Sequence, residues 1–550
     1  MGMLDDILSR GYFPKELPPC FTTVSFAQTI MNVSNKPKMF DEGKTTARAC
    51  IHNLARAGSL RRKLNIVNPI PFFPLAKCIA DNWSQLESKC KGSYLSKSLP
   101  VIDSSSQRAI VSCNVESDLT ESRSQIRAPQ YVIIKTDIAN FYPSIYTHSI
   151  PWALHGKSVA KRQKKNTALL GNKIDTFLRN CQDGQTMGIP IGPDISLVIA
   201  ELILATVDES IFSKLNNPDG VRYYDDYEFA VKSAMRANEI LGLLQEFLGE
   251  FELTLNPNKT ILSNLPHELE HSWVHQIRTF EFRNGAGQKA DIIKFFDLLF
   301  NLIRTYPAHH VAKYALTRFY LENLGDRLVN DNWPLLESLI LQTCMAEPGG
   351  LPSAYRIILE QGKKGRPIDK NLISTMLTNK IAHDAPLGYS SEVAWSLWGA
   401  IALDIKLNDI DVKSITSMND SIVALLSLDA HDRKLLCLTQ GDIALWQQYM
   451  LEDELYGSQW LLAYEACHKG WILDTKTLPY LSRDPAFSFL HANEVSFYEP
   501  ISSDPLASLV NVIKTTSRTD LYPVSLSTTV AETEEERDEE SEDSEYDSLK

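Results

Sequence analysis

The sequence predicts an α+β fold in three parts: a strand-containing part over 1–270, a helical part over 271–510 and an acidic tail over 511–550. Short segments rich in Val, Ile, Tyr and Phe, two of which run into Asp, indicate strands in the first part. From about 285 to 500, apolar residues recur at helical spacing. The tail has almost no apolar side chains, so we expect disorder from about 515 onward.

An acidic pair, Asp225-Asp226, stands between the apolar runs Val221–Tyr224 and Tyr227–Val231. Aromatic and β-branched residues favour extended chain on both sides, and Asp-Asp is typical of a turn. The pattern predicts a β-hairpin with carboxylates at its tip. Taken alone, such a tip is more often a solvated turn than a functional site.

A second predicted strand, Tyr131–Thr136, ends in Asp137. Three carboxylates at the ends of adjacent strands repel one another unless cations neutralise them. Hard divalent ions do so, Mg²⁺ above all, while keeping coordination positions open for water and phosphate. Two such ions roughly 3.5–4 Å apart clamp the attacking and leaving oxygens of a phosphoryl displacement. We therefore expect two Mg²⁺ ions and nucleotidyl transfer.

Four segments in chain order resemble the palm motifs of a reverse transcriptase. Asp137 with Tyr142 five residues on is similar to motif A, Gly188–Ser196 to motif B, Tyr223–Asp226 to motif C and Leu255–Thr260 to motif D. The first aspartates of motifs A and C are 88 residues apart, a spacing typical of the family. The resemblance implies a right-hand polymerase palm with fingers, and an RNA-directed DNA polymerase that uses dNTPs.

By this resemblance Asp137, Asp225 and Asp226 are the catalytic carboxylates and the metal ligands, joined by the backbone carbonyl of Ile138. Lys259 would stand near the leaving pyrophosphate, either stabilising developing charge or donating a proton. A surface lysine in a turn is the alternative interpretation of Lys259.

Motif B and Tyr142 concern the nucleotide itself. Gly188, Pro190 and Gly192 form a loop whose glycines let the backbone approach a nucleotide closely, although an ordinary helix-entry loop explains them too. The ring of Tyr142 would exclude a ribose 2′-hydroxyl and favour deoxynucleotides, unless it is only a core residue. Ile191 stands where many reverse transcriptases carry Gln, which implies altered handling of the template strand.

The segment Ser59–Pro69 resembles the fingers hairpin of the family. Its basic residues Arg61, Arg62 and Lys63 would cover the incoming triphosphate, with Arg giving bidentate phosphate contact. Alternation along a strand puts Arg61 and Lys63 on one face and Arg62 on the other. Which face meets the nucleotide stays open, and a solvated charged hairpin is the alternative.

Two further segments, Gly11–Pro19 and Phe141–Lys157, resemble the bacterial defence-associated reverse transcriptases, which include the abortive-infection enzymes. This resemblance implies an antiphage polymerase with HEAT-like helical repeats in place of a thumb, assembled as a homo-oligomer. It also implies DNA synthesis that is templated by RNA or untemplated, and started from a protein tyrosine that stays covalently attached to the product. Tyr12 is the candidate primer, with a core-facing aromatic as the alternative.

Other functions remain open at this point. A retron-type enzyme, which copies a dedicated non-coding RNA, or a group II intron-type enzyme would carry the same palm motifs. A non-catalytic RNA-binding scaffold is an alternative of another class, although the chain has kept all three aspartates.

The formal net charge of −13 does not exclude nucleic acid as a partner. Residues 531–550 hold eleven Asp and Glu against two cations, a net of −9, so the other 530 residues carry only −4. A basic channel in a nearly neutral body is compatible with polynucleotide binding. A basic block that fits a phosphate backbone consists of Lys157, Lys161, Arg162, Lys164 and Lys165.

The remaining composition indicates compartment rather than activity. No stretch approaches the roughly 20 apolar residues of a membrane span, and the N-terminus lacks a signal pattern. Nine scattered cysteines without a Cys-x-x-Cys pair indicate neither a zinc site nor a disulfide framework. We expect a cytoplasmic protein without membrane contact.

Overall fold

The computed structural model describes residues 2–56, 60–114, 116–321, 324–408, 410–473, 480–501, 504–507 and 509. The acidic tail, for which disorder is predicted, lies outside these residues. The α+β class is confirmed, because helices and sheets both contribute to the described part of the chain. Within that part no helix combines the length and apolar character needed to cross a bilayer.

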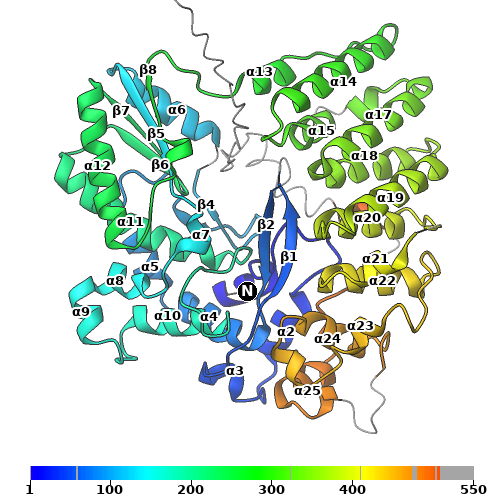
Figure 1. Ribbon diagram of the computed structural model, residues 1–550, viewed down its shortest axis with the longest axis horizontal. Coiled ribbons are helices and arrows are strands. Elements are labelled where there is room, and N and C mark those ends of the chain that lie inside the picture. The colour runs from blue at the N-terminus through cyan, green and yellow to red at the C-terminus, as the bar shows by residue number, and fades with distance from the viewer. Residues whose placement is uncertain are drawn as a thin grey trace, which may run out of the picture.

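A four-stranded antiparallel sheet occupies one side of the molecule (Figure 1). Its order is β6 (Gly220–Tyr223), β7 (Asp226–Val231), β5 (Val132–Asp137) and β8 (Ile261–Asn264). The central strands β5 and β7 consist largely of buried β-branched and aromatic residues, which suit a covered sheet. Both predicted strands therefore exist and are neighbours, which places their terminal aspartates at one edge.

Helices pack around this sheet. The α12 helix (Ala234–Glu250) contacts β5 and β7, and α6 (Glu116–Arg127) contacts β6 and β7. The long helix α11 (Ile195–Leu215) is apolar nearly all round and is almost entirely buried, as expected for a helix in the middle of a domain.

A second antiparallel pair stands apart from the sheet near the middle of the molecule (Figure 1). It consists of β1 (Cys50–Ala55) and β2 (Arg61–Ile66), with Ala55 opposite Arg61 next to the turn. The α4 helix (Pro69–Asp81) follows, begun by the side chain of Asn68, which accepts the Ile70 N–H. A third pair consists of β3 (Pro100–Ile102) and β4 (Ile110–Ser112).

Short helices complete the first part of the chain. They are α1 (Met3–Arg10), α2 (Val24–Asn32), α3 (Met39–Glu42), α5 (Trp83–Cys90), α7 (Phe141–Ser144), α8 (Ser149–His155), α9 (Lys157–Arg162), α10 (Leu170–Asn180) and the 3₁₀ turn η1 (Pro257–Lys259).

From residue 272 to 492 the described residues form helices and no named strand. In Figure 1 these helices form an arc that runs from the end of the sheet to the chain's start. The longer ones are α14 (Gln288–Thr305), α15 (Val311–Leu321), α17 (Trp333–Ala346), α18 (Leu351–Lys363), α19 (Lys370–Asp384), α20 (Ser390–Ala402), α22 (Ser421–Asp432) and α24 (Trp460–His468). The shorter ones are α13 (Ser272–Arg278), α16 (Leu324–Arg327), α21 (Val412–Thr416), α23 (Ala444–Gln447) and α25 (Pro485–Ala492), with 3₁₀ turns η2 (Asn330–Asn332), η3 (Pro348–Gly350), η4 (Asp453–Tyr456) and η5 (Tyr480–Ser482).

The helical arc and the first part of the chain share one core. Most of their buried apolar residues belong to one cluster that extends from Ile7 to Leu509, and a small second cluster of Leu119, Val221 and Tyr223 lies beside the sheet. The segment after α25 returns to the N-terminal segment, where the Thr22 N–H donates to the Phe497 carbonyl at 3.0 Å. The indole of Trp460 also donates to the Ile66 carbonyl at 2.9 Å, at the end of β2. The arc therefore supports the β1–β2 hairpin directly.

Candidate active site

The predicted acidic hairpin is confirmed, and its turn is strained. Tyr223 pairs with Asp226, so Tyr224 and Asp225 form a two-residue turn between β6 and β7. Tyr224 has a φ of +52°, which is uncommon for a bulky residue. Its N–H donates to Ser98 Oγ at 2.8 Å, and its carbonyl accepts from Arg222 Nη1 at 2.7 Å. Both polar ends of Tyr224 are thus fixed.

A buried charge network supports this turn from below. The guanidinium of Arg222 is completely buried and pairs with Glu201 and Asp208 of α11, each at 2.8 Å. Glu201 also accepts from Ser98 Oγ at 2.7 Å, and Asp208 accepts from the Tyr227 hydroxyl at 2.9 Å. Sequence reasoning missed this network. Its signal was two acids spaced by seven residues, on one face of an otherwise apolar helix.

The carboxylates meet at the edge where β5 ends and β7 begins. Asp137 is the direct register partner of Asp226, so their side chains leave the sheet on the same face. Burial raises the pKa of Asp225 to about 6, and the neighbouring charge of Asp137 is the next cause. The positive charges of Lys259 and Arg62 act on that pKa in the opposite direction. Carboxylates from two segments 88 residues apart therefore form one electrostatic unit.

Lys259 lies in this unit and not on the open surface. Its Nζ donates to Asp137 Oδ2 at 2.9 Å, and its side chain is largely buried. The Asn256 N–H donates to the Asp137 carbonyl at 2.8 Å, which anchors the loop that carries Lys259 to the end of β5. Ile138 forms an isolated bridge with Leu255 of the same loop.

The carboxylates can be tested for their fit to a divalent cation. Asp137 Oδ1 is buried and accepts no hydrogen bond, so one oxygen is left for a positive charge. However, the described part of the chain contains no group of three or more His, Cys, Asp or Glu side chains that could hold a metal ion. The three-carboxylate ligand set therefore stays a prediction. Mg²⁺ is usually bound through one or two carboxylates plus substrate phosphates, and Asp137 with Asp225 fits that smaller set.

The glycines of motif B have a structural reason for their identity. Gly188 and Gly192 have φ values of +82° and +138°, where a side chain is strained. A Cβ on Gly192 would come within 2.5 Å of Pro14, so the close neighbour of this glycine is the N-terminal segment of the chain. Pro190 contributes its carbonyl, which accepts from Ser196 Oγ at 2.6 Å. These contacts are the ones expected of an ordinary loop at the start of a helix, which is the alternative interpretation of motif B.

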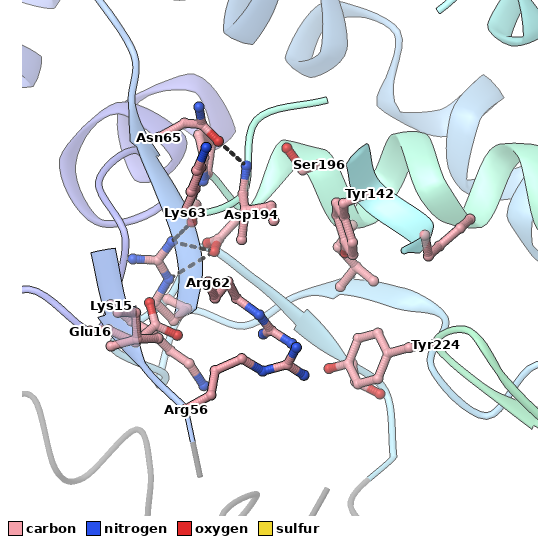
Figure 2. A pocket seen from close by; sticks show the side chains of 18 of the residues that line it. Lys15, Glu16, Arg56, Arg62, Lys63, Asn65, Tyr142, Asp194, Ser196 and Tyr224 are labelled. Atoms are coloured by element: carbon pink, nitrogen blue, oxygen red, sulfur yellow. Dashed lines mark hydrogen bonds and ion pairs between the residues drawn. The ribbon is translucent and has the colours of Figure 1, made fainter. Parts of the chain in front are cut away.

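A side chain from the β3–β4 connection fixes the same loop. Arg108 donates to Asp194 at 2.7 Å, to the Phe13 carbonyl at 2.7 Å and to the Gly192 carbonyl at 3.1 Å. One guanidinium therefore joins the N-terminal segment to the entry of α11. Figure 2 shows Asp194 beside the labelled residues of the cavity wall.

The fingers hairpin divides its basic residues between two faces, as alternation requires. Arg61 contacts Glu392 of α20 at 2.6 Å, and its guanidinium lies 3.5 Å from the ring centre of Tyr389. Arg61 is thus engaged by the helical arc at the wall of the cavity, and its role at the triphosphate stays a prediction. Figure 2 shows Arg62 extending toward Tyr224 instead. Lys63 is exposed and lines the same cavity.

Arg56, which sequence reasoning missed, lies beside Arg62. Both guanidinium groups extend toward the strained turn in Figure 2. Burial lowers the pKa of Arg56, the charge of Arg62 acts in the same direction, and Asp225 and Asp137 oppose them. The signal for Arg56 was its place one residue beyond Ala55, the last paired residue of β1.

One cavity of about 1510 Å³ connects these groups. The turn residues, Tyr142, the motif B loop and the β1–β2 hairpin form one side. The starts of α15, α18 and α20 contribute the other, Glu392 of α20 included. This volume exceeds the roughly 300–1,000 Å³ of a small-molecule site, so a polymer strand fits beside a nucleotide. None of the five residues of the basic block on and after α9 lines it.

Tyr12 lies far from any such opening. Its ring is completely buried and stacks on Phe72 at 3.9 Å, and its hydroxyl donates to the Val67 carbonyl at 2.5 Å. A priming hydroxyl has to reach the aspartates, so the expectation for Tyr12 is wrong in this structure. The alternative interpretation, a core-facing aromatic, describes it.

Comparison with known proteins gives limited information. No protein-family model and no curated protein matches the chain. Telomerase from Candida albicans with a fragment of telomeric RNA aligns over 62% of this chain and 66% of its own, at 12% identity and a TM-score of 0.29. Apo telomerase from Candida tropicalis aligns over 62% and 69%, at 11% identity and a TM-score of 0.31. The same enzyme with the RNA fragment aligns over 70% and 64%, at 13% identity and a TM-score of 0.27.

The chain thus spans just under two thirds of the length of the Candida albicans telomerase. At TM-scores this low the likeness carries no functional argument. A proposal about function therefore rests on the geometry of the carboxylates and of the residues around them.

Proposed function

We propose that the chain is a reverse-transcriptase-type DNA polymerase, which adds deoxynucleotides to a 3′-hydroxyl by two-metal nucleotidyl transfer. One observation carries the proposal. Asp137 lies opposite Asp226 on adjacent strands, with Asp225 in the adjoining turn, at a cavity that two arginines also enter. Carboxylates that concentrate charge beside cationic side chains suit a substrate with a metal-bound triphosphate.

The residues have distinct parts in this reaction. Asp137 and Asp225 would hold the Mg²⁺ ions, which when bound supply charge stabilisation to the attacking and leaving oxygens. The 3′-hydroxyl gives up its proton to solvent, and its oxygen forms a bond to the α-phosphorus while the bond from that phosphorus to the pyrophosphate oxygen breaks. Lys259, held beside Asp137 at 2.9 Å, carries a proton on Nζ that can pass to the pyrophosphate.

Two further groups position the nucleotide. The guanidinium groups of Arg56 and Arg62 neutralise the β- and γ-phosphates, and bidentate contact orients them. Tyr142 lines the cavity between motif A and the motif B loop, where its ring would lie against the sugar. The wide cavity leaves room for the end of a template strand, for which RNA is the proposed chemistry.

The test is incorporation of a labelled dNTP by purified protein in Mg²⁺. Asp225→Ala/Asp226→Ala should lower the rate by about 10³-fold or more, because metal-assisted charge stabilisation contributes several kcal/mol. Asp432→Ala, which removes an exposed carboxylate of α22, is the matched control and should behave as wild type. Equal incorporation by wild type and the double variant would show that these aspartates are not the catalytic groups.

The finer proposal is that this polymerase acts in defence against phage. It is supported by the segments Gly11–Pro19 and Phe141–Lys157 and by a helical arc where other polymerases carry a thumb. Expression of wild type in bacteria should reduce phage plating, and the double aspartate variant should not. Equal protection by both proteins would separate defence from DNA synthesis.

A further inference from the structure

The helical arc contacts the β1–β2 hairpin through three polar contacts. His52 Nδ1 lies 2.9 Å from Asp420, and the Ala55 N–H donates to Ser391 Oγ at 2.8 Å. The third contact joins Arg61 to Glu392. The last two lie next to the turn of the hairpin, the end of the hairpin that borders the cavity.

The Arg61–Glu392 contact is the most enclosed of the three. The Glu392 carboxylate is almost completely buried and also accepts from Ser391 Oγ at 2.8 Å. The ring of Tyr389 covers the Arg61 guanidinium. An ion pair shielded in this way resists separation, since either charge left alone would stay buried without a partner.

The alternation of side chains along β2 relates the Arg61–Glu392 contact to the position of Arg62 in the cavity. Adjacent residues of β2 point to opposite faces, so a hairpin held by Arg61 on one face presents Arg62 on the other. Figure 2 shows Arg62 directed toward the strained turn, in agreement with the effect of its charge on Asp225.

We propose that Glu392 is a positioning residue of the nucleotide site: by holding Arg61, it orients Arg62 toward the triphosphate of the incoming nucleotide. The inference rests on the proposed polymerase function and deepens it, because it makes α20 of the helical arc part of nucleotide binding. In this role Glu392 acts on the nucleotide through Arg61 and Arg62.

Other contacts keep the base of the hairpin in place without Glu392. Trp460 Nε1 donates to the Ile66 carbonyl, and the Asn65 N–H donates to the Ile191 carbonyl at 2.8 Å. Loss of the Glu392 contact should therefore release the turn end of the hairpin and leave the fold intact. This separates a positioning role from a merely structural one.

The experiment measures dNTP affinity and turnover in full-length Glu392→Gln. We expect KM for the dNTP to rise about tenfold, which corresponds to one charge-assisted phosphate contact, with kcat changed less than threefold. The Kd for the dNTP, measured in Ca²⁺ without turnover, should rise by the same factor. Asp297→Asn, at an exposed carboxylate of α14, is the matched control.

A double-mutant cycle tests whether Glu392 acts through Arg62. If Glu392 acts through Arg62, the rise in KM for Glu392→Gln/Arg62→Ala should equal that for Arg62→Ala alone. If KM in the double variant instead rises by the product of the two separate increases, the proposal is overturned. An unchanged KM and Kd in Glu392→Gln would overturn it as well. Arg61→Lys, which keeps the charge and loses the planar contact, is the second variant if Glu392→Gln folds poorly, and should also raise KM.

The outcome is distinguishable from failure of the proposed function. If Asp225→Ala/Asp226→Ala abolishes incorporation and Glu392→Gln leaves KM and Kd unchanged, only the positioning role is lost. If the aspartate variant incorporates dNTP normally, the polymerase assignment itself is wrong.

Discussion

Asn65 of the fingers hairpin and Ile191 of motif B form a reciprocal pair of hydrogen bonds. The Asn65 N–H donates to the Ile191 carbonyl at 2.8 Å, and the Ile191 N–H donates to the Asn65 side-chain oxygen at 2.9 Å. A side chain thus completes a short stretch of backbone pairing between two segments 126 residues apart. Ile191 stands at the position where the resemblance leads one to expect Gln. Its backbone, and not its side chain, joins the fingers hairpin to the motif B loop.

The first prediction concerns this pair. Asn65→Ala leaves the Ile191 N–H without its acceptor and should lower the free energy of unfolding by about 1–3 kcal/mol. Asn65→Asp keeps the acceptor oxygen and should stay within about 0.5 kcal/mol of wild type. Urea unfolding of the three proteins measures both values. Equal loss in the Ala and Asp variants would show that the hydrogen bond does not matter.

Tyr142 provides a prediction about sugar selection. Tyr142→Val removes the ring and should increase use of ribonucleotides relative to deoxynucleotides by about tenfold or more, because steric exclusion of the 2′-hydroxyl is lost. Tyr142→Phe keeps the ring and serves as the control. The ratio of kcat/KM for dNTP and rNTP is the measurement, and an unchanged ratio in the Val variant would make Tyr142 a core residue only.

The network below the turn predicts a large effect on stability. Arg222→Met leaves Glu201 and Asp208 buried without their cation and should cost about 3–5 kcal/mol of unfolding free energy. Arg236→Met breaks the exposed pair of Arg236 with Glu239 and should cost less than about 1 kcal/mol. Similar losses in both variants, measured by chemical denaturation, would contradict the assignment of a buried network.

Glu347 predicts a pH dependence of stability. This carboxylate accepts the N–H groups of Ala312 and Lys313 at the start of α15, and burial raises its pKa to about 7. A raised pKa means that the folded protein holds the proton more tightly than the unfolded chain does. The contribution is present below about pH 4.5 and is lost as pH rises through 7.

The measurement is unfolding free energy at pH 5 and pH 8 for wild type and Glu347→Gln. Wild type should lose about 2–3 kcal/mol more than the variant between these values, since the amide does not titrate. A parallel pH dependence in the two proteins would mean that Glu347 keeps an ordinary pKa.

Local patterns were sufficient to predict the central part of the site. Asp137 ends a strand of β-branched residues, and Asp225 stands in a turn between two aromatic runs, so neighbouring residues specify each position. Lys259, for which the sequence predicts a place near the leaving pyrophosphate, contacts Asp137 in the structure. Its contact with Asp137 required only that the loop after α12 return to the end of β5.

Residues whose environment comes from distant segments could not be predicted in the same way. The buried partner of Arg61 is Glu392, which lies 331 residues from it in the sequence. The burial of Tyr12 is completed by Val67 and Phe72, which come from a later segment of the chain. The sequence predicts that Gly192 lets the backbone approach a nucleotide closely. In the structure the segment that approaches Gly192 is the one with Pro14.

The pairing of the two ends of the chain has a consequence for biosynthesis. Ser25 donates to the Ser496 carbonyl across 471 residues, so the first helices lack part of their partner surface until residue 496 has been translated. At 5–20 residues per second this delay is on the order of half a minute or more. A polypeptide released by the ribosome before residue 496 would leave this part of its N-terminal segment uncovered.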